Sequence, residues 1–509
     1  MGPVEAHASR RGSATRTRAC VLLGAIASSF ALSFIDVDIG AGQTPAPLIV
    51  QIDQQHPANP VPRRFLGLSF ELSSLGQVAG FADRGDLVSL LRSLGPGILR
   101  FGGVSADTRV AWVDRTTPRP PWASDVLEVA QLRALRRLAV KSGWRVLLTV
   151  GLAHFEPRAA AHEMAAARRA LGPWLAGIEV GNEPDAYAHH GLRPLPWTHL
   201  QYAQEVAVYR KAMGRGAHRI PLAGPGVTGS RAFARWGSAE ARRDRPALLT
   251  GHHYPLGCRN VPPPSIEALL SPSLQQLEDA SLARFVLVSR RSGIPLRLDE
   301  VNTVSCGGVA GISDTFASAL WATGYIAKAM AAGVSGINLH GHPANCTGYS
   351  PLCAPTPARL AKGQLTAQPE WYALRLASVL IGDRPLRVGI PSTPSQPRPN
   401  VTVTALRSRH RSLHLVIVDD QAAPAAALTM SVEVGRAYRS ATVLPLTGPS
   451  LAATGGVRLG GVRVSRDGSW HAPKQLAQIP VRRGLLELTV APSSAMLVTV
   501  THGRRQGRR

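Results

Sequence analysis

Between residues 61 and 384, short apolar runs alternate with longer stretches in which apolar residues recur at helical spacing. The longer stretches include 132–140, 198–213, 273–291 and 315–332, and each predicts a helix. Buried parallel strands read as nearly continuous apolar runs. Eight such runs are present, at 65–71, 97–103, 145–150, 177–183, 221–225, 248–255, 295–302 and 334–340. Eight strands alternating with helices predict an α/β fold, a (β/α)8 TIM barrel over residues 61–384.

After residue 385 the pattern changes to short alternating segments separated by Gly, Pro and Asp. Examples are 401–406, 413–418 and 486–490, which show no helical period. Such alternation predicts an all-β sandwich over residues 385–502. The apolar run 48–52 precedes the barrel, and we expect this part of the chain (43–60) to add a strand to the sandwich.

The N-terminus has the layout of a secretory signal. Four arginines within the first 18 residues precede an apolar segment at 19–35, and small residues follow at 40–42. We therefore expect residues 1–42 to direct export and the protein to be secreted. The alternative is that the segment stays in place as a membrane anchor, because about 17 apolar residues is near the lower limit for spanning a bilayer.

The chain of 509 residues carries a formal net charge of +25, which comes almost wholly from arginine and includes a basic tail at 503–509. One explanation is a genome whose base composition favours Arg, Ala, Gly and Pro. The other is attraction to a polyanion such as an acidic polysaccharide. Nucleic acid is not expected as a partner, because no stripe of basic residues is interleaved with aromatic ones.

Export makes the cysteines candidates for disulfides. Cys20 lies in the expected signal, and Cys258, Cys306, Cys346 and Cys353 remain. Four cysteines allow three connectivities. The sequence favours Cys346 with Cys353, which bracket a short loop, and hence Cys258 with Cys306. A zinc site is not expected, because the spacing matches no common ligand pair.

Two glutamates follow predicted strands at the positions where a barrel enzyme carries its chemistry. Glu183 ends the run 177–183, and Glu300 lies in the run 295–302, 117 residues later. That interval suits three further strand–helix units, which would place both side chains at the carboxyl end of the barrel. Two carboxylates about 5–5.5 Å apart can cleave a glycosidic bond with retention of configuration. The structural alternative is a pair of unrelated surface glutamates.

These motifs resemble the retaining glycoside hydrolases of clan A, and within that clan family 79, the β-glucuronidase and heparanase family. The resemblance is carried by residues 100–103 (RFGG), 179–185 (EVGNEPD), 252–254 (HHY), 299–302 (DEVN) and 345–349 (NCTGY). These segments span the whole predicted barrel, and the family also has an appended β-sandwich. One position departs from the family, because Ser305 stands where members commonly have a tyrosine, five residues beyond the nucleophile.

The resemblance implies that Glu183 is the acid/base and Glu300 the nucleophile. It further implies that Asn182 binds the sugar 2-hydroxyl and that Tyr254 holds the nucleophile by a hydrogen bond. The remaining substrate contacts that we expect are Glu71, Gly103 and Asp107 for hydroxyl groups and Gly348 and Tyr349 for a carboxylate. His252, His253 and His340 are expected to line the same rim. No cofactor and no metal are implied.

The sequence thus predicts a secreted O-glycosyl hydrolase that releases β-glucuronosyl groups from an oligosaccharide, polysaccharide or other glycoside. One alternative is the same chemistry on a neutral sugar: a glucoside, xyloside or arabinoside. Another, from a different class, is a non-catalytic protein that binds acidic polysaccharides through its basic surface.

Overall fold

The computed structural model describes residues 46–214, 216, 220–391, 399–422 and 424–502. The expected signal segment, Cys20 and the basic tail lie outside these residues. Described residues from Ala46 onward belong to one compact unit. Within the described part of the chain, no helix is long and apolar enough to cross a membrane.

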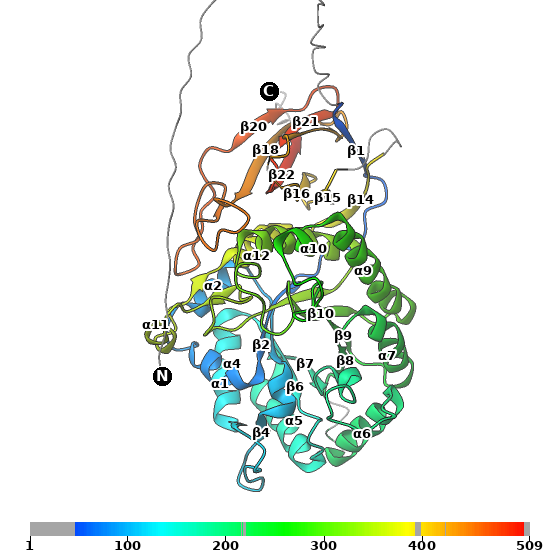
Figure 1. Cartoon of the computed structure of the whole chain (residues 1–509), viewed down its shortest axis with the longest axis vertical. Helices are drawn as coiled ribbons and strands as arrows, with labels where there is room; N and C mark the ends of the chain where they lie inside the picture. The colour runs from blue at the N-terminus through cyan, green and yellow to red at the C-terminus, as the bar shows by residue number, and fades with distance from the viewer. Residues whose placement is uncertain (1–45, 215, 217–219, 392–398, 423, 503–509) are drawn as a thin grey trace, which may run out of the picture. The chain divides into compact units, whose positions relative to one another are not determined.

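The barrel is a parallel sheet with the strand order β7-β6-β3-β2-β11-β10-β9-β8. A parallel bridge between Ile178 and Leu222 brings the two end strands together. Figure 1 shows the helices arranged around these strands. The barrel strands are β2 (Leu66–Glu71), β3 (Ile98–Gly102), β6 (Arg145–Val150), β7 (Leu175–Val180), β8 (Ala223–Val227), β9 (Leu248–His253), β10 (Leu296–Val301) and β11 (Gly336–His340). The predicted TIM barrel is confirmed.

Strand β8 begins two residues later than the sequence pattern indicates. Its register against β9 shifts between Pro225 and Val227, where Gly226 has a φ of 57°. Glycine tolerates this left-handed backbone, so the strand continues past Pro225 through a bulge. The carbonyl of Gly226 then accepts a hydrogen bond from the backbone N–H of Glu183 at 2.9 Å.

The helices begin and end where local chemistry satisfies their free backbone groups. Thr198 and Gln201 form a capping box at the start of α6, and Gly143, Gly293 and Gly333 end α4, α9 and α10 in left-handed conformation. The main helices are α1 (Leu75–Gly80), α2 (Leu87–Ser93), α4 (Val129–Ser142), α5 (Pro157–Leu171), α6 (His199–Ala212), α7 (Ser230–Arg243), α9 (Pro272–Ser292), α10 (Phe316–Ala332) and α12 (Pro369–Ala377).

Short elements fill the connections around the barrel. They are η1 (Leu72–Ser74), α3 (Val104–Thr108), β4 (Val110–Trp112), β5 (Asp125–Leu127), η2 (Gly172–Trp174), η3 (Pro184–Ala186), α8 (Ile266–Leu269), β12 (Leu352–Cys353), α11 (Pro357–Ala361), β13 (Thr366–Ala367) and η5 (Ser378–Leu380).

The second layer is a ten-stranded, mostly antiparallel sheet that folds back on itself, which confirms the predicted sandwich. Residues from strands far apart in the sheet order, such as Leu486 of β21 and Val498 of β22, share one apolar core. The alternation in β21, with Leu486, Leu488 and Val490 buried, is typical of a strand with one wet face. The strands are β1 (Leu48–Asp53), β14 (Arg384–Gly389), β15 (Val401–Arg407), β16 (Leu413–Asp419), β17 (Leu428–Glu433), β18 (Tyr438–Thr447), β19 (Arg458–Leu459), β20 (Ala477–Pro480), β21 (Leu485–Val490) and β22 (Ser494–His502).

Helix α10 packs between the barrel and the sandwich. It is buried on almost all sides, and residues of the sandwich such as Val416 and Val418 belong to the same apolar core as this helix. Strand β1 precedes the barrel in sequence, yet it pairs with β14 and β17 inside the sandwich sheet.

Candidate active site

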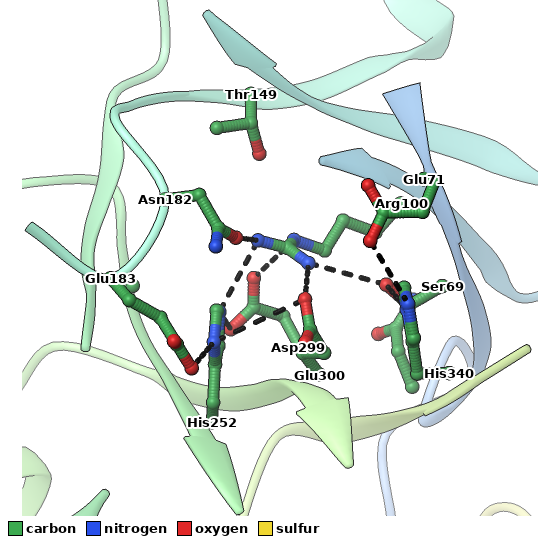
Figure 2. Close-up of polar contacts among 12 residues, drawn as sticks. Ser69, Glu71, Arg100, Thr149, Asn182, Glu183, His252, Asp299, Glu300 and His340 are labelled. Atoms are coloured by element: carbon green, nitrogen blue, oxygen red, sulfur yellow. Dashed lines mark hydrogen bonds and ion pairs between the residues drawn. The ribbon is translucent and has the colours of Figure 1, made fainter. Parts of the chain in front are cut away.

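Glu183 and Glu300 meet at the carboxyl end of the barrel strands. Glu183 follows β7 with a φ of 51°, and Glu300 lies in β10. One carboxylate oxygen of each lies within 4.8 Å of the other and of a ring nitrogen of His252. This separation is on the scale of the about 5–5.5 Å typical of retaining glycosidases and well short of the about 6.5–9.5 Å of inverting ones. Figure 2 shows both side chains pointing toward His252.

A bulge in β10 turns two consecutive acidic residues toward the barrel axis. The register against β9 shifts between Leu298 and Glu300, so Asp299 is the extra residue. Side chains of neighbouring strand residues normally point to opposite faces. Because of the bulge, Asp299 and Glu300 both reach the guanidinium of Arg100.

Arg100 is fully buried at the centre of the site and was given no role by the sequence. Its Nε lies 3.0 Å from Glu179 and 2.9 Å from Asp299, and its Nη1 contacts Glu300. Its Nη2 donates to Oδ1 of Asn182 at 3.0 Å. The available signal was a charged residue inside an otherwise apolar strand, since a buried arginine requires acidic partners.

Three acidic residues, Glu179, Asp299 and Glu300, contact the single positive charge of Arg100. Burial and the neighbouring Glu179 raise the pKa of Asp299 well above its ordinary value. Neither carboxyl oxygen of Asp299 accepts a hydrogen bond from a described residue, so its charged form would lack the donors that stabilise a buried carboxylate. Asp299 therefore holds a proton, and Glu179 and Glu300 are the carboxylates that neutralise the guanidinium. Thr149 also donates to Glu179, at 2.9 Å.

Glu300 is held in its ionised form. Burial opposes ionisation, but His340, His252 and Arg100 outweigh it and lower the pKa of Glu300 below its ordinary range. The phenol of Tyr254 adds a hydrogen bond to Oε1 at 2.9 Å. An ionised carboxylate with a donor on each oxygen is oriented for nucleophilic attack.

His252 lies between the two glutamates. One ring nitrogen, Nδ1, is 2.9 Å from Oε1 of Glu183, and the other, Nε2, is 3.2 Å from Nη2 of Arg100. Burial opposes a charge on this ring, but Glu300 and the hydrogen bond to Glu183 outweigh burial and raise the pKa of His252 to about 9. The ring is therefore a cation at neutral pH, and its Nδ1–H donates to Glu183. Glu183, His252 and Glu300 could also bridge a divalent cation, but Arg100 already contacts the last two and opposes a second positive charge.

His253 does not line the rim, and that prediction is wrong. It follows His252 in β9, so its side chain points to the opposite face of the strand. There Nε2 lies 3.2 Å from Glu278 on α9, and the ring stacks on Tyr325 with centroids 4.6 Å apart. His340, by contrast, faces the site, with Nδ1 at 3.0 Å from Oγ of Ser69.

Asp107 is not available to bind sugar hydroxyls, and that prediction is also wrong. Its side chain is buried and accepts hydrogen bonds from the backbone N–H groups of Leu152, Ala153 and Asn182 and from the phenol of Tyr187. These four donors saturate the carboxylate, which contacts the backbone of Asn182 and does not face the pocket. Asp107 thereby fixes the backbone beside Glu183.

Glu71 ends β2 and lies across the site from Glu183 (Figure 2). It accepts a hydrogen bond from the backbone N–H of Ser105 at 2.9 Å and lies 3.7 Å from Nε2 of His340. Its side chain remains 20% exposed, which leaves an oxygen free for a ligand. Gly103 is required for this contact. Its φ is 72°, and a Cβ there would lie 2.4 Å from Oε1 of Glu71.

The loop after β11 packs against Tyr254. The hydroxyl groups of Tyr254 and Tyr349 are 3.3 Å apart, and the backbone N–H of Gly307 donates to Tyr349 at 3.2 Å. Gly348 lies against the same segment, where a Cβ would meet the carbonyl of Gly307 at 2.1 Å. Two disulfides brace these loops. Cys258–Cys306 joins the loops after β9 and β10, and Cys346–Cys353 lies within the loop after β11.

Comparison with known proteins places the fold among the glycoside hydrolases. No family model matches the sequence. A β-glucuronidase of Aspergillus niger is 30% identical over 174 residues, which is 30% of this chain and 31% of that protein. The chain thus matches less than a third of this curated relative.

Solved structures match over most of the chain at low sequence identity. A 4-O-α-L-rhamnosyl-β-D-glucuronidase from Fusarium oxysporum superposes with a TM-score of 0.70 and 17% identity, over 89% of this chain and 100% of that one. A GH51 arabinofuranosidase from Xanthomonas axonopodis gives 0.62 and 14%, over 89% and 100%. A GH39 enzyme from the same organism gives 0.56 and 16%, over 92% and 100%. The fold is therefore one shared with these clan A hydrolases.

Proposed function

We propose that this protein is a retaining β-glycoside hydrolase. The observation that carries the proposal is the approach of Glu183 and Glu300 to within 4.8 Å at the mouth of the barrel. The surrounding groups match the two tasks of the mechanism. Tyr254 and Arg100 keep Glu300 ionised and aimed, and the side chain of Glu183 is 20% exposed, where it can reach a leaving group.

In the first step, a carboxylate oxygen of Glu300 attacks the anomeric carbon and the glycosidic C–O bond breaks. Glu183 gives its proton to the departing oxygen, so the aglycone leaves as an alcohol and the sugar remains as an ester of Glu300. In the second step, Glu183, now a carboxylate, removes a proton from water. The hydroxide adds to the anomeric carbon and releases Glu300. Two inversions give net retention.

Asn182 is the residue that we propose for the sugar 2-hydroxyl. Its Oδ1 already accepts from Arg100, which leaves the amide N–H₂ as donor to the substrate. This bond strengthens as charge develops on the ring in the transition state. Glu71 and His340, across the pocket, are placed to bind other hydroxyl groups.

We further propose family 79 and a β-glucuronosyl substrate. Support comes from the motifs in five barrel segments, from the partial similarity to the Aspergillus β-glucuronidase and from the similar fold of the Fusarium rhamnosyl-glucuronidase. Tyr349 and the backbone near Gly348 are the proposed carboxylate site. Ser305, which stands where the family commonly has a tyrosine, accepts a hydrogen bond from the backbone N–H of Cys258 at 3.1 Å and is not part of the proposed site.

Secretion remains a proposal. Two disulfides favour an oxidising compartment, and they agree with the signal-like N-terminal sequence.

The test is hydrolysis of 4-nitrophenyl β-glucuronide, β-glucoside, β-xyloside and α-arabinofuranoside by the purified full chain. We expect the glucuronide to give the highest kcat/KM, and NMR to show the β-anomer as the first product. Release of the α-anomer would refute the retaining mechanism. A faster neutral glycoside would favour the alternative substrate class, which the similar folds of arabinofuranosidases make worth testing. Failure to hydrolyse any of the four would favour a non-catalytic role.

A further inference from the structure

A hollow on the sandwich is lined by four arginines, and we call it the arginine pocket. Its volume is about 450 Å³. Arg384 begins β14, Arg407 ends β15, and Arg409 and Arg411 lie in the turn between β15 and β16. Tyr438 and His502 also line the hollow, and both contact the backbone carbonyl of Arg411, at 3.1 and 3.0 Å. None of these residues belongs to the candidate active site.

Backbone carbonyls hold two of the four guanidinium groups in place. Nη1 of Arg407 donates to the carbonyl of Gln54 at 3.1 Å, and Nη1 of Arg384 donates to that of Ala58 at 3.3 Å. Arg409 packs over Gly382, where a Cβ would lie 2.8 Å from Nη2. The turn itself is closed by backbone bonds, with Arg411 at a φ of 65°. Backbone contacts of Arg407 and Arg384, and the turn that carries Arg409 and Arg411, thus bring the four arginines to one hollow.

None of the four arginines forms an ion pair with any residue that the structure describes. Elsewhere the protein does pair its arginines, as in Arg193 with Glu205 at 2.8 Å and Arg109 with Asp125 at 3.0 Å. Asp383, in an adjoining hollow, lies 2.6 Å from His414 instead. Four guanidinium groups around one concavity repel one another, and an anion in the pocket removes that repulsion.

We propose that the arginine pocket binds the anionic groups, carboxylate or sulfate, of an acidic polysaccharide. Guanidinium groups bind such anions through paired, charge-assisted hydrogen bonds. The choice of a glycan rests on the proposed function, because a polymer held on the sandwich would stay close to a hydrolase site on the same chain. The pocket is therefore a second carbohydrate site that raises affinity for polymer without touching the bond that is cleaved.

A nucleic acid fits the pocket less well. Proteins that hold single strands stack bases on free aromatic faces. Tyr438 is only 4% exposed, and one face of its ring is covered by His502, with centroids 4.3 Å apart. The hollow thus offers charge and hydrogen-bond donors but no free aromatic surface.

The test compares two double variants of the full chain that remove the same charge. Arg409→Gln with Arg411→Gln changes the pocket, and neither side chain makes a hydrogen bond to another described residue. Arg231→Gln with Arg235→Gln removes two exposed arginines from α7. Binding is measured at about 0.15 M salt to polygalacturonate, dextran sulfate, neutral dextran and single-stranded DNA, together with turnover of 4-nitrophenyl β-glucuronide.

We expect the pocket variant to lose at least about tenfold in affinity for polygalacturonate, dextran sulfate or both, because two charge-assisted contacts are lost. The α7 variant should stay within about twofold of wild type. The glycan that loses affinity identifies the anion. Turnover of the small substrate should be equal in all three proteins.

Equal losses of glycan affinity in the two variants would refute the proposed glycan site, since the loss would then reflect the net charge of the protein rather than the arginine pocket. Absence of glycan binding, or tighter binding of DNA that depends on Arg409 and Arg411, would also refute it. Glycan binding that depends on the pocket, without turnover, would refute the proposed hydrolase function but support the glycan site. Turnover without such binding would refute the glycan site but support the hydrolase function.

Discussion

The phenolic oxygen of Tyr254 lies 2.9 Å from Oε1 of Glu300. The two residues come from neighbouring strands, and a disulfide between Cys258 and Cys306 joins the loops that follow those strands. The hydrogen bond favours the charged form of the carboxylate and fixes its orientation. The donor is itself held by Tyr349. The proposed nucleophile is thus set by contacts from three consecutive strand ends.

Removing the charge of Glu300 should abolish turnover without unfolding the protein. We expect Glu300→Gln to lower kcat for an aryl β-glucuronide by at least about a thousandfold, since no covalent intermediate can form. Circular dichroism should be unchanged. Residual activity above about a thousandth of wild type would contradict the assignment.

Glu183→Ala is the matched test for the acid/base. We expect hydrolysis by this variant to be slow. Added azide should restore the rate of turnover, because azide needs no general base to attack the sugar ester. The product should be the β-glycosyl azide, which NMR can identify. Rescue of Glu300→Gln by azide with the same β product would reverse the two roles.

Tyr254→Phe should change the pH dependence of the reaction as well as its rate. The hydrogen bond from Tyr254 helps to lower the pKa of Glu300, so its loss raises that pKa. We expect the acidic limb of the kcat/KM profile to move to higher pH and kcat to fall about ten- to a hundredfold. A lower rate with an unmoved acidic limb would show that Tyr254 acts by packing alone.

Asp299 should tolerate the loss of its acidity. Because burial raises the pKa of Asp299 and favours its protonated form, Asp299→Asn replaces one neutral donor by another and should retain activity within about tenfold. Glu179→Gln removes a charge that neutralises Arg100 and should lower kcat by about ten- to a hundredfold. If Asp299→Asn is the more damaging of the two, the proton has been assigned to the wrong carboxyl.

Glu163 should make the stability of the protein depend on pH. Burial raises its pKa from 4.5 to about 8, and its Oε1 has no hydrogen-bond partner among the described residues. Between these values the folded state binds a proton that the unfolded chain releases, so stability falls as pH rises from about 4.5 to 8. Glu163→Gln carries no such proton. Its melting temperature should equal that of wild type at pH 4.5 and exceed it by a few degrees at pH 8.5. Parallel pH profiles of the two proteins would contradict this.

The barrel could be predicted because burial on both faces makes its strands continuous apolar runs. Glu183 and Glu300 could be paired because a parallel barrel brings all carboxyl ends of its strands to one rim. It was harder to predict which side chains point toward the barrel axis and which point away from it. His252 and His253 are adjacent, and only the register of β9 shows which one faces the site.

The charge network around Arg100 could not be derived from the pattern. A regular strand would direct Asp299 away from Glu300, and the bulge that turns both inward has no clear sequence signal. Asp107 was misjudged for a related reason. A carboxylate near a strand end can serve the substrate or the backbone, and only the four donors around it decide between these roles.

The position of β1 has a consequence for how the chain is made. Strand β1, with its buried Leu48 and Val50, leaves the ribosome before any of the barrel, but its pairing partners β14 and β17 are synthesised only after the whole barrel. Until then this strand has no neighbour on either edge. A chain cut after residue 384 would keep it permanently in that state, and such an unpaired apolar strand is a template for aggregation.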